Sequence, residues 1–294
     1  MKLNRIKSIF FLLGIYCAAI LLSFLAGFFL PVDNPLVKAG IIDFCATVFI
    51  FKISISCNNS SVYDPYWSVA PMALAGYWIF ITPHNDQNLL RTLMIAALIL
   101  FWSNRLTYNF FRQWKGFIQE DWRYVDLRKS TRKWYWFVSF FGIHFFPTVM
   151  VFLACVPVYF AITKGNRPTG AVDIAAFLVT LSGIMMETIA DNQLRSHVAS
   201  HAGPRKTLRT GLRRYSRHPN YFGEIMFWWG MYLFAVAADV RFWWSIFGPV
   251  GVTLLFIFIS IPIMEKRMLK RRYDYPDYKK HVSVLIPLFP KKNS

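Results

Sequence analysis

The side chains best suited to bind a polar ligand are concentrated in one short segment, residues 215–224, which reads Tyr-Ser-Arg-His-Pro-Asn-Tyr-Phe-Gly-Glu. The chain becomes strongly apolar directly after it. Pro219 is favoured at the first position of a helix, and Glu224 then lies near the start of that helix, where its dipole favours a carboxylate. His218 and Asn220 supply hydrogen-bonding groups beside that turn. We therefore expect a polar ligand to bind where this segment meets a buried helix.

A group of cations precedes and enters this segment, at Arg205, Lys206, Arg209, Arg213, Arg214 and Arg217. One interpretation is a set of phosphate contacts for a nucleotide, because guanidinium and ammonium groups bind phosphate oxygens well. The alternative is a loop held against anionic lipid head groups, which requires only positive charge. Both interpretations stay open for individual members of the group.

A stripe of charge lies upstream, where Glu187, Asp191 and Arg195 follow one another at i, i+4 and i+8. This spacing puts the three side chains on one face of a helix. The two acids could accept hydrogen bonds from a ribose or an amide group. The alternative is an internal ion pair between Asp191 and Arg195. The position of the stripe at a predicted membrane edge, leading into the cationic segment, favours the ligand.

A second group of candidates lies earlier in the chain, where Asp64-Pro65-Tyr66-Trp67 enters an apolar run. An acid beside aromatic residues, with proline fixing the backbone, can hold a proton donor at the mouth of a pocket. Alternatively, the aromatics anchor the segment at the membrane interface and Asp64 caps the helix. Asp43 lies inside the preceding apolar run, where an ionisable group indicates function unless it bonds a neighbouring helix.

Arg105 and Tyr108 are three residues apart near the end of another apolar run, so they share a helix face. Arg105 lies about two turns inside the expected membrane edge, deeper than a snorkelling side chain needs to be. A buried guanidinium needs an anionic partner, either a carboxylate or a bound phosphate. For Arg123, in the following polar segment, an ion pair with Asp64 or Glu120 is the alternative to a ligand contact.

Composition defines the class of protein that positions these residues. Of 294 residues, 55% are hydrophobic and only 16% are charged, whereas ordinary globular domains carry about a quarter charged residues. We predict an all-α, polytopic transmembrane helix bundle that forms one integral-membrane domain, 1–294, with N-terminal spans in 1–60 and the functional region in 61–294. The cysteines are scattered and form no metal-binding pattern, so no metal site is expected.

Eight apolar runs are long enough, or nearly long enough, to cross a bilayer: 8–30, 37–56, 68–82, 90–111, 136–162, 172–190, 224–239 and 242–264. Eight spans put both termini on one side of the membrane. Of the 33 Lys and Arg residues, 26 lie in the four segments that this topology assigns to the cytoplasm, as the positive-inside rule requires. Both termini and the 215–224 segment are therefore predicted to be cytoplasmic. Cations confined to short loops also favour membrane lipid, and not nucleic acid, as the partner.

Residues 211–224 resemble the signature of bacterial steroid 5-alpha-reductase-like membrane proteins. The resemblance extends to further segments and covers most of the chain after the first two runs: 64–67, 120–124, 187–193 and 275–287. The shorter pattern Arg217-His218-Pro219 with Tyr221 and Gly223 is also similar to isoprenylcysteine carboxyl methyltransferases and to sterol reductases of the same broader superfamily.

The resemblance implies an integral-membrane reductase, in the inner membrane of a bacterium, whose cytoplasmic loops and helix ends enclose NADPH. It implies hydride transfer to an activated C=C bond of a lipid-soluble substrate (steroid-, isoprenoid- or fatty-acyl-like) that enters from the bilayer. By motif position, cofactor contacts fall on Asp191, Lys206, Tyr215, Asn220 and Glu224. Glu187 stands where the steroid enzymes have an Asn. The remaining cofactor contacts that we expect are Arg105, Arg123, Arg195, Arg217, His218 and Tyr221.

The eukaryotic steroid enzymes polarise the enone oxygen with a Glu and a Tyr, but the corresponding Glu motif is not recognisable in this sequence. We therefore assign proton donation to Asp64 and Tyr66, or to Tyr108. The chief alternative is an S-adenosylmethionine-dependent methyltransferase acting on a lipid or a prenylcysteine, a pattern that does not predict the motifs at 64–67 and 187–195. A third is a non-enzymatic lipid-binding or transport protein, although the sequence lacks the two repeated halves typical of transporters.

Overall fold

The computed structural model describes residues 4–165, 167–200 and 206–291. Over these ranges the chain is all-α, as predicted, with one isolated parallel β-bridge between Ser216 and Ser283. The chain divides into two compact units, Met1–Asn166 and Arg167–Ser294, called unit 1 and unit 2 below. Three of the predicted cytoplasmic cations, Lys2, Arg205 and Lys292, lie outside the described residues.

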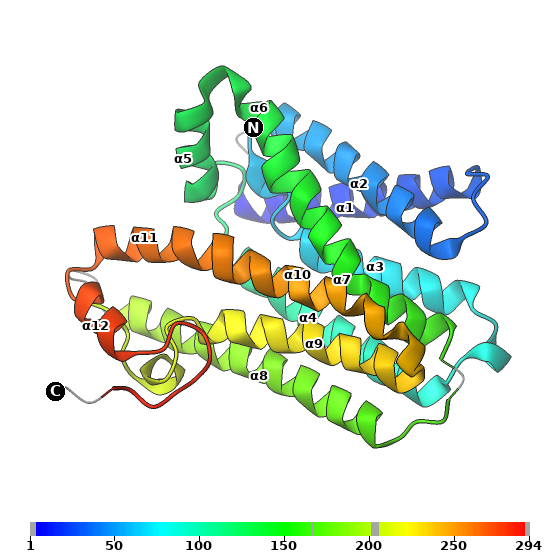
Figure 1. Ribbon diagram of the computed structural model, residues 1–294. Helices are drawn as coiled ribbons and strands as arrows, with labels where there is room; N and C mark the ends of the chain where they lie inside the picture. The colour runs from blue at the N-terminus through cyan, green and yellow to red at the C-terminus, as the bar shows by residue number, and fades with distance from the viewer. Residues whose placement is uncertain (1–3, 166, 201–205, 292–294) are drawn as a thin grey trace. The chain divides into compact units, whose positions relative to one another are not determined.

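Unit 1 is drawn from blue to green in Figure 1. Its helices are α1 (Arg5–Phe28), α2 (Pro35–Cys57), α3 (Tyr66–Ile81), α4 (Leu89–Gln113), α5 (Trp122–Thr131), α6 (Tyr135–Ser139) and α7 (Phe146–Thr163). Short 3-10 turns occur at Ser60–Val62, His84–Asp86 and Arg132–Trp134, and a π-helical turn, Phe140–Phe145, joins α6 to α7. Several helices begin at a polar residue whose side chain accepts a backbone N–H of the first turn, namely Asn4, Asn34, Asn88 and Asp121.

Unit 2 consists of α8 (Ala171–Ser200), α9 (Pro219–Ala238), α10 (Phe247–Leu255), α11 (Ile261–Arg271) and α12 (Tyr275–His281). It also contains 3-10 turns at Gly211–Arg214 and Val240–Ile246 and a π-helical turn at Phe256–Ser260. The predicted start of α9 at Pro219 is confirmed. The ring of Pro219 fixes the backbone in a helical conformation where its missing N–H is not needed.

Helices α8 and α9 run side by side (Figure 1) and approach each other closely at glycines. A Cβ atom added to Gly223 would lie 2.5 Å from the carbonyl oxygen of Gly183 and 3.0 Å from the backbone nitrogen of Glu187. Both of these are backbone atoms, so no larger residue fits at Gly223 unless a helix moves. The glycine in the 215–224 segment therefore sets the separation of the two helices that carry Glu187 and Glu224.

Five helical stretches are long and apolar enough to cross a membrane: Arg5–Phe28, Leu89–Gln113, Trp122–Thr163, Ala171–Ser200 and Val240–Arg271. The prediction of a polytopic membrane protein is confirmed, but the count by length and hydropathy is five among the described residues, against eight predicted. The remaining three predicted runs form helices α2, α3 and α9. Of these, α3 has 16 residues, or about 24 Å of helix, which is shorter than a hydrocarbon core of about 30 Å. The cytoplasmic placement of both termini stays a prediction.

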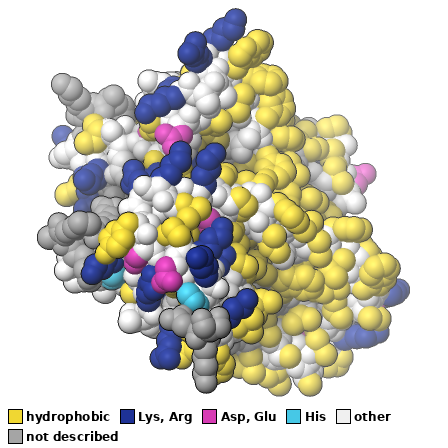
Figure 2. All heavy atoms as spheres, turned by 60° about the vertical axis from the view of Figure 1, so that its left-hand side comes forward, with side chains coloured by type: hydrophobic (Ala, Val, Ile, Leu, Met, Phe, Trp, Pro, Cys, Tyr) yellow, Lys and Arg dark blue, Asp and Glu magenta, His cyan; other side chains and the backbone are white. Residues whose placement is uncertain are grey.

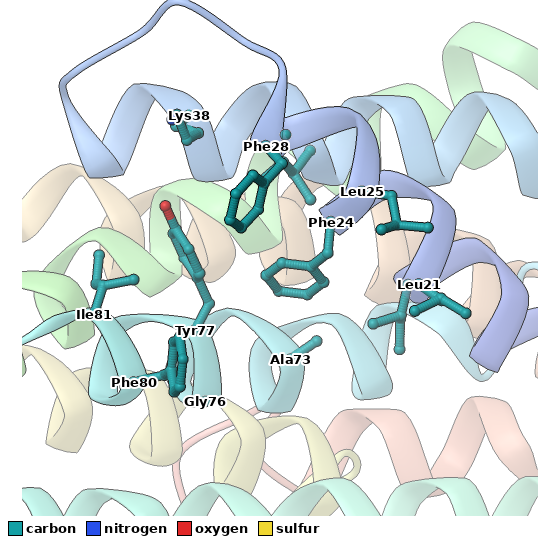
Figure 3. Close-up of a pocket in the computed structure, with 13 residues that line it drawn as sticks. Leu21, Phe24, Leu25, Phe28, Lys38, Ala73, Gly76, Tyr77, Phe80 and Ile81 are labelled. Atoms are coloured by element: carbon teal, nitrogen blue, oxygen red, sulfur yellow. The ribbon is translucent and has the colours of Figure 1, made fainter.

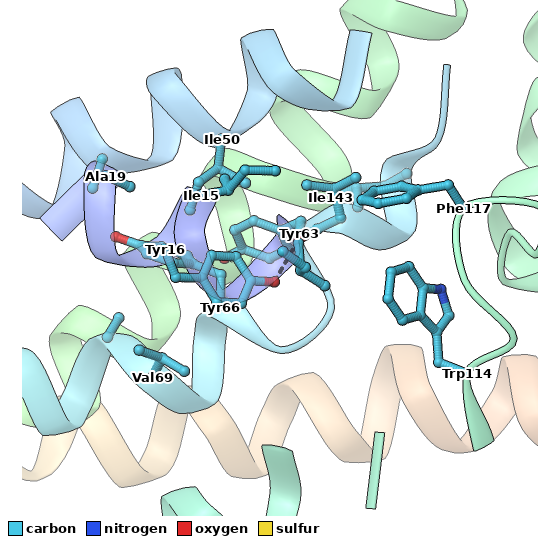
Figure 4. Packing of buried hydrophobic residues seen from close by; sticks show 14 residues of the cluster. Ile15, Tyr16, Ala19, Ile50, Tyr63, Tyr66, Val69, Trp114, Phe117 and Ile143 are labelled. Atoms are coloured by element: carbon cyan, nitrogen blue, oxygen red, sulfur yellow. Dashed lines mark hydrogen bonds between the residues drawn. The ribbon is translucent and has the colours of Figure 1, made fainter. Parts of the chain in front are cut away.

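The core of unit 1 is rich in tyrosine. The rings of Tyr16, Tyr63 and Tyr66 lie together (Figure 4), with centroids 5.6 Å apart for Tyr63 and Tyr66 and 6.1 Å apart for Tyr16 and Tyr66. All three are almost fully buried. Broad areas of exposed apolar side chains (Figure 2) indicate the surface that contacts lipid.

Candidate functional site

Each unit contains a buried polar cluster, and the 215–224 segment lies in that of unit 2. The segment is fastened to the C-terminal part of the chain by backbone and side-chain bonds. Ser216 pairs with Ser283 and donates its hydroxyl to the carbonyl of Leu285 at 2.6 Å. The backbone N–H of Leu288 donates to the carbonyl of Tyr215 at 3.0 Å. These contacts hold the segment rigid at the start of α9.

Arg217 makes further hydrogen bonds that hold the segment in place. Its Nε donates to Glu265 Oε1 at 2.7 Å, and its Nη1 donates to the carbonyls of Lys279 at 2.8 Å and Val282 at 2.7 Å. Its side chain is only 9% exposed. The predicted cofactor contact at Arg217 is thus a guanidinium already engaged by one carboxylate and two carbonyl groups.

Glu265, on α11, contacts several other polar side chains in addition to Arg217. Lys279 Nζ lies 2.8 Å from its Oε2, and the Tyr275 hydroxyl donates to Oε1 at 3.4 Å. His218 Nε2 is 3.6 Å from Oε1. Burial lowers the pKa of His218, although the nearby Glu265 opposes this effect. A neutral His218 at physiological pH keeps one ring nitrogen able to accept a hydrogen bond.

Three buried polar atoms near the start of α9 lack a hydrogen-bond partner among the described residues: Arg213 Nε, His218 Nε2 and Asn220 Oδ1. Buried polar atoms are normally satisfied, because an unmade hydrogen bond costs about 1–3 kcal/mol. The His218 ring also stacks on Tyr221, with centroids 5.2 Å apart and planes 5° apart. Arg213, in the turn before the segment, therefore offers a donor to a ligand, and Asn220 offers an acceptor. His218 Nε2 faces the Glu265 carboxylate at 3.6 Å, so a ligand would compete with Glu265 for it.

The predicted acids Glu187 and Glu224 lie on facing helices, at the glycine contact between α8 and α9. Both are buried, at 6% and 3% exposure. Glu224 Oε1 accepts a hydrogen bond of 2.9 Å from Trp228 Nε1, one turn further along α9. Asp191 and Arg195 continue the predicted stripe along α8 and are partly buried.

Lys206 and Tyr215 lie at the edge of this cluster. Lys206 is exposed, and Tyr215 packs its ring edge against Phe289 at 5.7 Å. A separate hollow of about 620 Å³ in unit 2 is lined by Asn192, Gln193 and Gly211 among others. Residues 192 and 193 lie on a different face of α8 from the Glu187 stripe. None of the predicted cofactor residues lines this hollow.

In unit 1, the predicted proton donors Asp64 and Tyr66 each belong to a carboxyl–phenol pair, with a different partner in each case. The Tyr66 hydroxyl donates to Asp43 Oδ1 at 2.6 Å and links α3 to α2, so Asp43 does make the bond to a neighbouring helix that was the alternative to a functional role. The Tyr124 hydroxyl donates to Asp64 Oδ1 at 2.5 Å. Asp43 is 4% exposed, and its Oδ2 has no hydrogen-bond partner among the described residues.

Asp64 does not cap a helix, because α3 begins after Pro65 and has no side-chain cap. The alternative reading of Asp64 as an N-cap is therefore wrong. Burial raises the pKa of Asp64 to about 7, while the Arg123 guanidinium and the Tyr124 hydrogen bond act in the opposite direction. A carboxyl group with this pKa can carry a proton near neutral pH.

The remaining candidates of unit 1 are Arg105, Tyr108 and Arg123. Arg105 is buried on α4, at 8% exposure, as its depth in the apolar run predicts. Tyr108 is 60% exposed, and the Arg112 guanidinium lies 5.1 Å from its ring centroid. Arg123 is exposed and pairs with Asp121 at 2.8 Å. The alternative of an ion pair with Glu120 is not realised, because Glu120 pairs with Arg128 at 3.1 Å.

Sequence reasoning missed part of the polar cluster of unit 1. His144, fully buried, lies 3.1 Å from the Ser54 hydroxyl and 3.0 Å from the Ser139 carbonyl. The hydroxyls of Tyr63, Thr148 and Thr47 form a chain with links of 2.8 and 2.9 Å. An ionisable residue inside an apolar run is a signal that could have found His144.

Residues 50–284 match the family model described as "Protein of unknown function (DUF1295)". A relative from Schizosaccharomyces pombe (strain 972 / ATCC 24843), described as "Uncharacterized protein C594.04c", is 30% identical over 281 residues, which cover 88% of this chain and 80% of the relative. No solved structure matches the chain significantly. The family match includes both the 64–67 and the 215–224 segments.

Proposed function

Because the chain belongs to the DUF1295 family, whose description gives no activity, we propose from its own residues that it is a membrane-embedded, NADPH-dependent reductase. Its substrate is a lipid-soluble compound with a C=C bond activated by a carbonyl group. The observation that carries this proposal is the set of unsatisfied buried atoms on Arg213, His218 and Asn220. A polar ligand with both donors and acceptors would satisfy all three.

The charges of unit 2 fit a phosphate-bearing cofactor. Arg217 and Arg209 are paired with carboxylates, Arg209 with Asp277 at 2.7 Å. Among the described residues, Lys206, Arg213 and Arg214 have no carboxylate within ion-pairing distance. These three are the cations that we expect to contact phosphate, and the N-terminus of α9 adds a favourable dipole. Arg217 becomes a positioning residue in this account and not a direct contact.

The carboxylates suit the sugar and amide groups of the same cofactor. Glu224 and Glu187 are buried carboxylates at the contact between α8 and α9, and Glu224 lies one turn after Asn220 on α9. Ribose hydroxyls and a carboxamide N–H are donors that such acceptors bind. NADPH carries both kinds of donor, as well as the phosphates discussed above.

When bound, NADPH supplies a hydride for the electron-poor carbon of the C=C bond. The chain must then supply a hydrogen-bond donor for the enolate oxygen and a proton for the neighbouring carbon. Tyr66 and Asp43 form the pair best suited to this task, because a phenol bonded to a carboxyl group can pass on a proton and recover one from its partner. Asp64 with Tyr124 is a second pair of the same chemistry, just before the start of α3.

An S-adenosylmethionine-dependent methyltransferase is the alternative. Methyl transfer needs a nucleophile on the substrate, but it has no use for an acid that protonates carbon. The two carboxyl–phenol pairs therefore favour the reductase. Replacement of Tyr66 by Phe distinguishes the two functions. In a reductase it should lower turnover and leave cofactor binding unchanged, whereas in a methyltransferase it should leave turnover unchanged as well.

The test is NADPH binding by purified protein carrying Asn220→Ala, measured by isothermal titration calorimetry. Loss of one hydrogen bond should weaken binding roughly threefold to tenfold. Asn192→Ala is the matched control, because Asn192 lines the separate hollow and should have no effect. Unchanged affinity in Asn220→Ala would contradict the proposed site, and a loss confined to Asn192→Ala would move the cofactor to the hollow.

A further inference from the structure

An apolar pocket of about 680 Å³ lies in unit 1 between α1, α2 and α3 (Figure 3). Its lining includes α1 from Ile20 to Phe28 and α3 from Ala73 to Ile81. Each of these walls is about 12 Å long at 1.5 Å per helical residue. The volume is within the range of roughly 300–1,000 Å³ that small-molecule sites occupy.

The pocket opens to the lipid-facing surface of unit 1. Phe28 is 89% exposed and Phe80 is 88% exposed, although both line the pocket. Leu21 and Leu25, at 60% and 51%, are exposed as well. A hydrocarbon chain in the surrounding bilayer could therefore enter sideways without crossing a polar barrier.

One end of the pocket is polar. In Figure 3, Lys38 and the hydroxyl of Tyr77 lie toward one end, and Leu21 and Leu25 lie toward the other. Lys38 is partly buried, and among the described residues no carboxylate lies within ion-pairing distance of it. A cation without a carboxylate partner at the end of an apolar pocket favours an anionic ligand, because a charge-assisted hydrogen bond to the anion adds to the burial of its apolar part.

We propose that this pocket binds a long-chain fatty acid, with its carboxylate at Lys38 and Tyr77 and its chain between α1 and α3. Lys38 is the one cation in the described lining, which matches a ligand of single negative charge. A phosphate carries more charge and is usually bound by several cations or an Arg fork. Apart from Lys38 and the hydroxyl of Tyr77, the lining side chains are apolar, as a hydrocarbon chain requires. This proposal concerns binding alone and stands whether or not the chain is a reductase.

Two variants test the pocket, and each has a matched control. Gly76→Leu should fill the space, because a Cβ atom at Gly76 meets no other atom within 4 Å. Gly14→Leu is its control, since Gly14 on α1 is equally open but does not line the pocket. Lys38→Gln removes the charge at the polar end. Lys52→Gln, on the same helix and outside the pocket, is its control.

The experiment is a titration of detergent-purified protein with radiolabelled palmitate, methyl palmitate and palmitoyl lysophosphatidate. We expect the wild type to prefer palmitate over its neutral methyl ester by about tenfold, the effect of one charge-assisted hydrogen bond. Lys38→Gln should abolish this preference, and Gly76→Leu should weaken all three ligands. Both controls should bind as the wild type does.

Several outcomes would overturn the proposal. Equal wild-type affinity for palmitate and methyl palmitate would exclude a role for Lys38 even if its variants failed to fold. Tighter binding of lysophosphatidate than of palmitate would assign the pocket to a phospholipid instead. Unchanged palmitate binding in a folded Gly76→Leu protein would place the fatty acid elsewhere on the chain.

Discussion

Replacement of Arg217 by Ala should destabilise the folded protein in the absence of any ligand. The change removes an ion pair with Glu265 at 2.7 Å and strips hydrogen bonds from the buried carbonyls of Lys279 and Val282. Removing one partner of a buried ion pair costs about 3–5 kcal/mol. Lys279 remains beside Glu265 at 2.8 Å, so the cost should lie near the lower limit.

The assay is thermal unfolding of the detergent-purified variant without cofactor. We expect the free energy of unfolding to fall by about 3 kcal/mol. For a chain of this size, each kcal/mol corresponds to roughly 2–4 °C, so Tm should fall by about 6–12 °C. Arg214→Ala is the control, because Arg214 is exposed and its guanidinium lies 5.8 Å from the Tyr215 ring, a contact of about 0.5–1 kcal/mol. If Arg217→Ala had the same Tm as the wild type and lost only NADPH binding, Arg217 would be a ligand contact and the structural role argued for it would be refuted.

Three further predictions concern packing, proton donation and pH. Gly223→Ala should lower the free energy of unfolding by about 1–3 kcal/mol through overpacking, whereas Gly14→Ala, in open space, should be neutral or stabilising in the same thermal assay. Tyr66→Phe should reduce the rate of substrate-dependent NADPH oxidation by about a hundredfold or more, whereas Tyr108→Phe should not, because Tyr108 is 60% exposed; equal effects would refute the assignment of Tyr66. Since burial raises the pKa of Asp64 to about 7, the folded state keeps a proton that the unfolded chain releases above about pH 4. Stability should therefore fall between about pH 4 and pH 7 and then level off. Asp64→Asn should remove this decline, and an unchanged pH profile would contradict it.

The fold class and the start of α9 could be predicted from sequence because both depend on local patterns. Apolar runs predict helices, and a proline such as Pro219 is favoured at the first position of a helix. The number of spans could not be predicted as well, because run length alone does not say where a helix begins. The run at 68–82 forms α3, Tyr66–Ile81, which begins two residues before the predicted run and is still too short to cross a bilayer without tilting or thinning of the membrane.

The partners of the candidate residues could not be predicted, since they come from distant parts of the chain. The sequence offered no partner for Tyr66, because the residue that it bonds lies 23 positions earlier in the chain. Tyr66 meets Asp43 on α2. Arg217 likewise finds Glu265, which is 48 positions further along the chain. Side-chain types and spacing identified which residues matter, whereas their roles depend on contacts that only the folded chain defines.

The most direct test of the central claim is a thermal-shift titration of the purified wild type with NADPH, NADH and S-adenosylmethionine in parallel. A ligand that binds only the folded state stabilises it by mass action and so raises Tm. At a concentration of a hundred times Kd, the free energy of unfolding increases by about 2.7 kcal/mol. We predict stabilisation by NADPH and none by S-adenosylmethionine. Stabilisation by S-adenosylmethionine alone would contradict it and identify a methyltransferase, and no stabilisation by any of the three would contradict a nucleotide site beside Asn220.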